Sequence, residues 1–224
     1  MKTVILSTND NPDYLSYLTY VQKAWNNIGW KTLTFYLGKK NIQSDNYNTI
    51  ISIENNSNYS DILVVQTSRF FGHRYTDGLI MISDIDMMPL SDYWHPSENA
   101  ITCYGHDLTG YGHIPMCYVA APKSQWDIII SENSIDELLQ KYPYLSEIND
   151  WYTDQEIITA RISTITSKVM IDRGQRRGVA IGRIDRCDWL TTKNNSDTKI
   201  DAHLLRPFNK EETLDLLYAY HNIK

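Results

Sequence analysis

A run of apolar residues that ends in two carboxylates constrains this chain more than any other feature of the sequence. Residues 78–90 read GLIMISDIDMMPL, and the first half of this segment predicts a buried strand. Because side chains along a strand alternate in direction, Asp84 and Asp86 should point to the same side at its carboxyl end, with Ile85 turned into the core. Two carboxylates so placed suit Mg²⁺ or Mn²⁺ carrying a phosphate, and the alternative is an acidic turn without a ligand.

The size and composition of the chain fit one α/β domain. Its 224 residues, 42% of them hydrophobic, suffice for a sizeable core. The net charge of −6 disfavours a nucleic-acid partner, because neutralising phosphates needs a basic face. Three widely spaced cysteines fit neither a disulfide framework nor a structural zinc site. No apolar stretch is long enough for a membrane span and no signal peptide is evident, so we expect a soluble, cytoplasmic protein.

Helical and strand patterns alternate along most of the chain. A strand, a helix and a strand over residues 2–37 open it, an order typical of α/β folds. Segment 61–71 fits a strand or a helix, and we favour a helix because Ser60 can cap it. Thr153 is expected to cap another helix, with Glu156 completing a capping box. The expected strands are 2–10, 31–37, 49–53, 78–86, 100–104, 116–121, 169–171 and 179–181, the expected helices are 13–28, 61–71, 123–130, 135–142 and 211–220, and a turn is expected at 193–197.

A flexible, polar loop follows the strand expected at 100–104. It contains three glycines and two histidines, His106 and His113. Because exposed loops often carry binding residues, we expect substrate contact there. Aromatic residues such as Trp151 and Tyr152 can supply flat surfaces that stack on a base or a sugar ring, although most single aromatic residues only fill core or surface.

The DxD motif at the end of an apolar strand resembles the metal-dependent GT-A glycosyltransferases, in which this motif holds a divalent ion on a nucleotide-sugar diphosphate. The helix with Gln66 and Arg69 ahead of the motif, the phrase WYTDQE at 151–156 and His203 ahead of an Arg-Pro pair follow the order of that class. The resemblance covers residues 2–208, and the DxD is its specific part. The compact length is similar to that of the small soluble glycosyltransferases of large algal viruses, which implies a viral protein in the host cytoplasm.

The resemblance implies a fold, a reaction and partners. The fold is a GT-A-like, Rossmann-like single domain over residues 1–224, with a mixed, mainly parallel central sheet flanked by helices. Its nucleotide-binding part would lie near 1–100, its acceptor-binding part near 101–208 and a closing helix at 211–222. The reaction is transfer of a sugar from a nucleoside diphosphate donor, UDP being favoured over GDP, to a hydroxyl of a glycan or glycoprotein acceptor.

On the donor side, the resemblance assigns metal and nucleotide residues by position. Asp86 is the direct ligand of Mn²⁺ or Mg²⁺, and Asp84 contacts the ribose or reaches the metal through water. His203 completes the protein ligands, although a lone histidine is more often an ordinary surface or core residue. Thr8 and Asp10, after the first strand, bind the uracil or the ribose, with capping of the next helix as the alternative.

On the acceptor side, Asp154 is the residue assigned to catalysis. An inverting enzyme needs a carboxylate as general base on the opposite face of the sugar, whereas in a retaining enzyme Asp154 or Gln155 would lie near the anomeric carbon. The alternative for Asp154 is an acid that stabilises the helix dipole. Arg69 approaches the donor sugar or steadies Asp84, with a purely structural ion pair as the alternative. The residues assigned to acceptor binding are His106, His113, Trp151 and Tyr152.

Other functions fit the sequence less well. A haloacid dehalogenase phosphatase also begins from a strand-end DxD, but it has Thr or Val where this chain has Met88. A nucleotidyltransferase would want a glycine-rich basic loop near the first strand, which residues 7–13 do not provide. A nucleotide-sugar or carbohydrate-binding module without turnover stays open as a non-enzymatic alternative.

Overall fold

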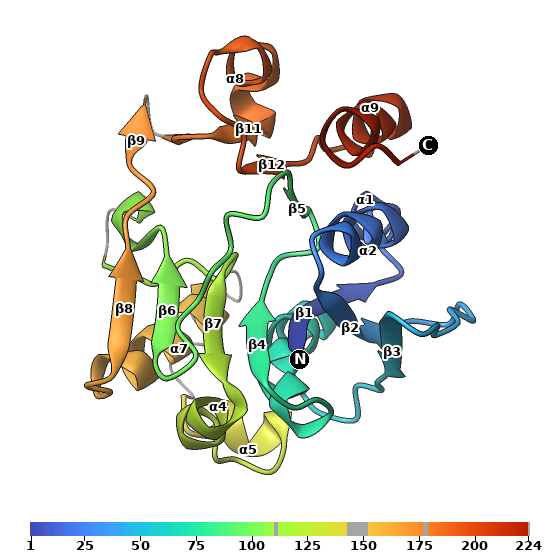
Figure 1. Ribbon diagram of the computed structural model, residues 1–224. Helices are drawn as coiled ribbons and strands as arrows, with labels where there is room; N and C mark the ends of the chain where they lie inside the picture. The colour runs from blue at the N-terminus through green and yellow to red at the C-terminus, as the bar shows by residue number, and fades with distance from the viewer. Residues whose placement is uncertain (110–111, 143–151, 177–178, 224) are drawn as a thin grey trace.

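The strand that precedes Asp84 lies in the middle of a seven-stranded sheet. The computed structural model describes residues 1–109, 112–142, 152–176 and 179–223. From one edge to the other the sheet consists of β3 (Asn48–Ser52), β2 (Lys31–Leu37), β1 (Lys2–Asn9), β4 (Leu79–Ile82), β7 (Val119–Pro122), β6 (Ile101–Tyr104) and β8 (Lys168–Ile171) (Figure 1).

Helices and shorter strands connect and cover this sheet. The helices are α1 (Pro12–Leu15), α2 (Leu18–Asn27), α3 (Asp61–Ser68), η1 (Arg69–Arg74), η2 (His106–Leu108), α4 (Lys123–Ile129), α5 (Ile135–Gln140), α7 (Thr153–Ser163), η4 (Arg186–Asp188), α8 (Trp189–Asn194) and α9 (Lys210–His221). A second sheet has the order β11 (Arg183–Asp185), β12 (Asp201–His203) and β5 (Met87–Pro89), and β9 (Gln175–Arg176) pairs with β10 (Val179–Ala180).

Strand pairing in the large sheet is mixed and mainly parallel, which confirms the expected fold class. β1 runs parallel to β2 and β4, β2 runs parallel to β3, and β6 runs parallel to β8. β7 lies antiparallel between β4 and β6. Parallel strands need covered faces, and their carboxyl ends share one edge where ligands usually bind. No helix in the described ranges is both long and apolar enough to span a membrane.

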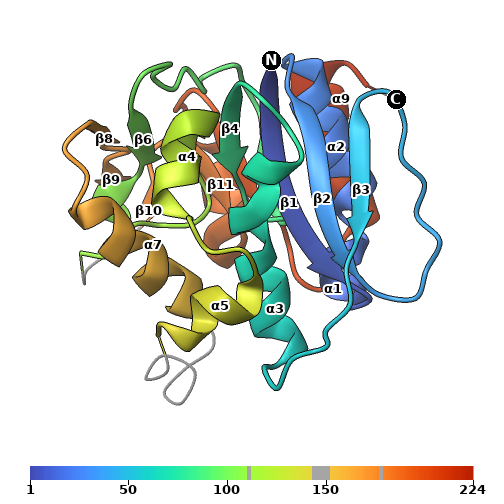
Figure 2. The ribbon, with the colours of Figure 1, turned by 90° about the horizontal axis from the view of Figure 1, so that it is seen from below.

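Each face of the large sheet carries its own hydrophobic core. On β1, Val4 and Leu6 pack with Trp25 of α2 in one cluster, while Ile5 packs with Leu63 of α3 in the other. This division follows from the alternating direction of strand side chains. Figure 2 shows α2 and α9 covering one face and α3, α4, α5 and α7 covering the other.

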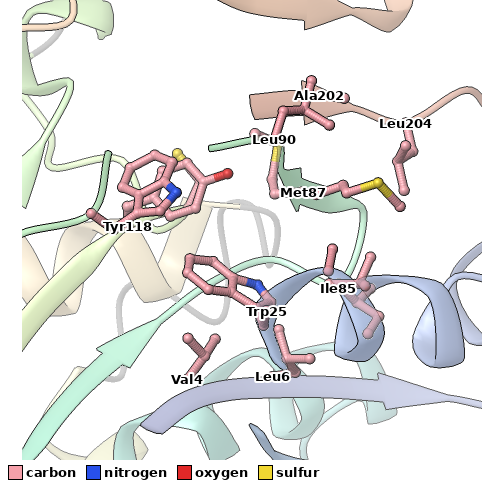
Figure 3. Close-up of a cluster of buried hydrophobic side chains, with 14 of the residues drawn as sticks. Val4, Leu6, Trp25, Ile85, Met87, Leu90, Tyr118, Ala202 and Leu204 are labelled. Carbon is pink, nitrogen blue, oxygen red and sulfur yellow. The ribbon is translucent and has the colours of Figure 1, made fainter. Parts of the chain in front are cut away.

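The small sheet lies beyond the carboxyl end of β4 and extends the first core (Figure 1). In Figure 3, Met87 of β5 and Ala202 of β12 lie above Trp25, and Ile85 also lies within this cluster. Residues 87–89 were expected in an apolar turn, but they pair antiparallel with β12. Because β5 is an edge strand of this sheet, Pro89 does not interrupt a ladder on its outer side.

Two expectations about helices are wrong in detail. The helix expected over 13–28 is divided into α1 and α2, because the N–H of Tyr17 bonds to the carbonyl of Tyr14, three residues back instead of four. Thr153 was expected as the N-cap of α7, but it is the first residue of that helix, and the N-cap residue is Tyr152, whose side chain makes no capping bond. By contrast, Ser60 does cap α3, and its hydroxyl accepts a bond from the N–H of Leu63.

Among the described α-helices, α8 was not expected. α8 covers part of the turn that was expected at 193–197. Its six residues are too few to show a helical period, and its N-cap residue, Asp188, makes no side-chain capping bond.

A buried ion-pair network fixes β12 in the small sheet. Asp201 is fully buried, and its carboxylate accepts bonds from Arg173 at 3.0 Å and from Arg183 at 2.9 Å. The guanidinium of Arg173 also lies over the rings of Tyr93 and Trp94. Burial alone would raise the pKa of Asp201, but the two arginines outweigh it and hold this pKa below its usual range.

We expect Asp201→Asn to lower the free energy of unfolding by about 3–5 kcal/mol, because Arg173 and Arg183 then lose the buried carboxylate that pairs with both of them. Urea unfolding followed by circular dichroism measures the change. Glu212→Gln is the matched control, because it weakens the less buried pair with Lys193 and should cost below about 1 kcal/mol. Equal effects of the two substitutions would contradict a structural role of the Asp201 network.

Candidate functional site

A cavity of about 330 Å³ opens at the carboxyl ends of β1 and β4. It lies where ligands bind in open α/β sheets. Its walls come from the end of β1, helices α1 and α3, the turn after β4, the start of α7 and the segment that follows β11. The lining residues are Ser7, Thr8, Asn9, Asn11, Tyr14, Ile62, Val65, Gln66, Arg69, Asp84, Ile85, Asp86, Met116, Asp154, Gln155, Arg186, His203 and Arg206.

The two DxD carboxylates lie in a turn and not on the strand itself. β4 ends at Ile82, and the N–H of Met87 bonds to the carbonyl of Asp84 across the turn. Asp84 and Asp86 both line the cavity, whereas Ile85 is buried in the first core. The side chains of Asp84, Ile85 and Asp86 therefore point in the alternating directions expected for a strand. The backbone that directs them is a tight turn.

Arg69 joins the first of these aspartates to Asp154. Its guanidinium donates one bond to Asp84 and another, of 2.5 Å, to Asp154. Its Nε also donates to the carbonyl of Gln66 on the preceding turn of helix. Arg69 and Asp154 are both buried, while the side chain of Asp84 is 37% exposed at the cavity. One arginine thus serves two carboxylates that come from different elements.

Sharing a single arginine leaves Asp154 with a high pKa. Burial raises it, Arg69 lowers it, and the nearby charge of Asp84 raises it again, so that the pKa of Asp154 lies at about 6. Its carboxylate also accepts a bond from the N–H of Gln155. A carboxyl group that titrates close to neutral pH can take up and release a proton under ordinary conditions.

Asp86 is surrounded by three basic side chains. Its Oδ2 accepts bonds from Arg186 at 2.8 Å and from Arg206 at 2.6 Å, and Nε2 of His203 lies 3.6 Å away. Burial would raise the pKa of this carboxyl, but His203, Arg206 and Arg186 together hold it below its usual range. Asp86 therefore stays ionised where Asp154 titrates.

His203 bridges two carboxylates. Its Nδ1 lies 3.4 Å from Oδ2 of Asp185, and its Nε2 faces Asp86. Burial lowers the pKa of His203, but the bonds to Asp185 and Asp86 outweigh this and raise it. A carboxylate behind a histidine is a frequent arrangement around metal ions, because it fixes which ring nitrogen faces the metal.

The donor set in the cavity suits a divalent cation. Asp84, Asp86 and His203 together offer carboxylate oxygens and an imidazole nitrogen, which Mn²⁺ accepts and Mg²⁺ accepts in part. Their ligand atoms are not all within 4.8 Å of one another. Among the described residues, the group of three that meets this distance is His106, Asp107 and Asp172, at an exposed loop outside the cavity lining.

Of the two residues assigned to the nucleotide, the structure brings only Thr8 into the cavity lining. The carboxylate of Asp10 accepts bonds from the hydroxyl of Tyr36 and the N–H of Lys39. These bonds hold the pKa of Asp10 below its usual range. Asp10 thus steadies the loop after β2, and its neighbours Asn9 and Asn11 line the cavity in its place.

Of the residues assigned to the acceptor, His106, His113 and Tyr152 lie outside the cavity lining. His106 is half-exposed, with its Nδ1 3.1 Å from a carboxylate oxygen of Asp172. His113 is half-buried, and Tyr152, just before α7, is 46% exposed. Trp151 falls outside the described residues.

Several residues of the site were not among the assigned ones, and Tyr14, Asp185, Arg186 and Arg206 make the polar contacts among them. Arg186 and Arg206 reach Asp86 across 100 and 120 residues of sequence. Arg206 also donates to the hydroxyl of Tyr14, and its guanidinium lies 4.5 Å from the centre of that ring. Arg206 belongs to the Arg-Pro pair that follows His203 in the sequence, whereas no local motif marks the other three positions.

The arrangement of the sheets and helices is the GT-A fold of glycosyltransferases. The galactosyltransferase LgtC, solved in complex with donor and acceptor sugar analogs, matches with a TM-score of 0.58 and 12% identity, over 99% of this chain and 97% of LgtC. An active-site mutant of LgtC gives a TM-score of 0.57 and 11% identity over the same shares, 99% and 97%. The glycosyltransferase GlyE of Streptococcus pneumoniae TIGR4 gives 0.52 and 13%, over 76% of this chain and 45% of GlyE. This chain thus spans less than half the length of GlyE.

These likenesses concern the fold. The sequence matches no protein-family model and no curated protein sequence, so the relation to glycosyltransferases is carried by three-dimensional structure alone.

We expect the carboxyl group of Asp154 to titrate at about 6, and Arg69→Gln to move this pKa higher, because the cation that opposes burial is lost. Carbon-detected NMR of aspartate-labelled protein measures both values. Since the folded pKa lies above the ordinary value of 3.8, the folded state holds the extra proton. The contribution of this group to stability is therefore complete below pH 3.8 and is lost as the pH rises through about 6. Titration at the ordinary value would contradict the shared-arginine arrangement.

Proposed function

We propose that this protein is a glycosyltransferase that moves a sugar from a nucleoside diphosphate donor to a hydroxyl group of an acceptor. The observation that carries the proposal is one cavity whose lining includes Asp84, Asp86 and His203 together with Asp154. It lies at the ligand-binding edge of a GT-A sheet, and both LgtC and GlyE are glycosyltransferases. The resemblance of the DxD motif to that class supports the same reaction.

Asp86, Asp84 and His203 would hold the divalent cation, Mn²⁺ or Mg²⁺. When bound, such an ion neutralises the charge that develops on the departing diphosphate. The residues of this chain supply the rest. Asp86 is ionised throughout the neutral range, and Asp185 behind His203 keeps the Nε2 of the ring turned toward Asp86. Arg186 and Arg206 add positive charge beside Asp86, where a diphosphate would lie.

The end of β1 supplies the nucleotide side of the proposed site. Thr8, Asn9 and Asn11 offer hydroxyl and amide groups that can bond to a base edge or a ribose. Asp10 would act indirectly, since its bonds to Tyr36 and Lys39 hold the loop after β2 in place next to these residues. We propose UDP as the nucleotide, in keeping with the resemblance of this strand end to the uracil site of the class.

Asp154 is the proposed catalytic residue. In an inverting reaction its carboxylate would accept the proton of the acceptor hydroxyl, which a pKa of about 6 allows at neutral pH. In a retaining reaction Asp154 or its neighbour Gln155, which also lines the cavity, would lie beside the anomeric carbon. Arg69 fixes the orientation of the Asp154 carboxylate in either case.

The acceptor would approach the open side of the cavity. Ile62 lines this cavity and is 53% exposed, and Met116 adds an apolar wall on which a sugar ring can pack. We propose a glycan or glycoprotein acceptor, with His106, His113, Trp151 and Tyr152 as more distant contacts for an extended chain. Three further points stay predictions: a single domain divided into a nucleotide part and an acceptor part, a location in the cytoplasm, and the likeness to glycosyltransferases of algal viruses.

Release of nucleoside diphosphate from a panel of UDP- and GDP-sugars, in Mn²⁺ and in Mg²⁺, tests the proposed function. We expect release from a UDP-sugar that depends on the metal and rises when a glycan acceptor is added. Asp154→Asn should lower the rate about 10²- to 10⁴-fold, the range for loss of a general base or acid. Asp127→Asn, at a half-exposed position on α4, is the control and should leave the rate unchanged. Donor binding without release from any sugar would leave a binding module and contradict transfer.

Asp185→Asn should weaken Mn²⁺ binding about 10- to 100-fold in the presence of UDP, the usual cost of losing a carboxylate behind a ligating histidine. The asparagine oxygen can still accept the bond from the N–H of Cys187, so that the short helix η4 is kept. Electron paramagnetic resonance of free Mn²⁺ measures the affinity. Asp188→Asn removes the same charge nearby and should have no such effect. An unchanged affinity in Asp185→Asn would exclude a role of Asp185 in placing His203.

A further inference from the structure

Asp86 is the point on which the basic side chains of the C-terminal segment converge. Arg186 and Arg206 both donate to the same oxygen, Oδ2, at 2.8 and 2.6 Å. His203 faces that same oxygen at 3.6 Å. A cation that binds this oxygen must therefore compete with two guanidinium groups that already neutralise it.

Basic side chains match or outnumber the carboxylates in the cavity. Among the described residues that line it, Asp84, Asp86 and Asp154 face the arginines at positions 69, 186 and 206, and His203, whose pKa is raised, lines it as well. A divalent cation that entered alone would add positive charge to a site whose carboxylates already have cationic partners, and a diphosphate alone would add negative charge beside three carboxylates. Both changes are costly where solvent is limited. A cation and a diphosphate that enter together bring charges that largely cancel.

The two arginines differ in what else holds them. Arg206 donates to the hydroxyl of Tyr14 and lies over the Tyr14 ring, so its position is fixed from a second side. Within the described part of the chain, the side-chain hydrogen bond of Arg186 is the one to Asp86. Its side chain is 22% exposed and stands at the cavity wall. Arg186 is thus the cation on Asp86 that can turn away with the loss of one bond.

We propose that Arg186 is an exchangeable counterion of Asp86, which it releases when a divalent cation and a nucleoside diphosphate enter the cavity together. The freed guanidinium then bonds to the diphosphate, for which its planar donor group is well suited. The inference rests on the proposed function. It makes the affinities for metal and nucleotide mutually dependent, each ligand tightening the other by the same factor.

Mn²⁺ binding measured by electron paramagnetic resonance, without and with saturating UDP, tests the proposal, with Mn²⁺ bound by UDP alone measured in parallel. In the unaltered protein, UDP should tighten Mn²⁺ binding at least about tenfold, the usual range of coupling between two sites. Arg186→Gln should bind Mn²⁺ alone at least about tenfold more tightly, because one unit charge next to Asp86 is lost. UDP should then add less to the Mn²⁺ affinity than in the unaltered protein.

Two control variants separate the counterion from general charge effects. Arg186→Lys keeps a cation at the position and should retain the dependence on UDP. Lys193→Gln removes a positive charge from α8, where it pairs with Glu212, and should leave the metal affinity unchanged. Thermal unfolding of each variant establishes that it is folded. If Arg186→Gln does not fold, the comparison of the unaltered protein with and without UDP decides the proposal.

Either of two results would overturn the inference: equal Mn²⁺ affinity of the unaltered protein with and without bound UDP, or Mn²⁺ binding by folded Arg186→Gln no tighter than that of the unaltered protein. Failure of UDP to bind under any condition is a separate result, which contradicts the proposed function and the coupling. If UDP does not bind but Arg186→Gln binds Mn²⁺ alone more tightly than the unaltered protein, Arg186 is still supported as the counterion that competes with a metal for Asp86.

Discussion

The cost of burying Asp86 and Asp154 governs the chemistry of this cavity. A buried aspartate must lie against a cation or give up its charge, and the cations are unevenly divided. Asp86 has two arginines and a histidine, whereas Asp84 and Asp154 share one arginine. The uneven division pushes two pKa values apart, so that Asp86 is a permanent anion and Asp154 titrates near neutral pH. Separation of this kind allows two carboxylates in one site to take different roles.

Main-chain pairing, more than side-chain contact, brings the C-terminal residues to this place. β12 lies antiparallel to β5 in a register that sets His203 opposite Met87, the residue after Asp86. The N–H of Leu204 bonds to the carbonyl of Asp86 itself. Because Asp201 anchors the other end of β12 to two buried arginines, the strand has little freedom to shift. The position of a candidate metal ligand therefore depends on a core ion pair on the same three-residue strand.

The sequence predicts the large sheet well, because long apolar strands and amphipathic helices carry clear periods. It also singles out Asp84 and Asp86, since carboxylates at the end of a buried strand are unusual, although it places them on the strand and not in the turn that follows it. Arg186 is invisible to such reasoning, because it follows a strand of three residues and meets Asp86 only through the tertiary fold. The position of Asp10 outside the cavity lining has a different reason: a polar residue at a strand end can turn toward the ligand edge or toward the next strand. Its partner Tyr36 lies on that next strand.

The separation of Asp86 and Arg206 by 120 residues has a consequence for the newly made chain. A ribosome that adds residues from the N-terminus completes β1, β4 and the DxD turn long before it adds Arg186, His203 and Arg206. During that interval Asp86 has none of these partners and is better solvated than buried. The turn that carries it therefore gains from remaining open until the last strands arrive. Closure of the cavity therefore waits for the synthesis of β12 and of Arg206 after it, and a ribosome-bound chain that stops short of β12 would lack the enclosed site.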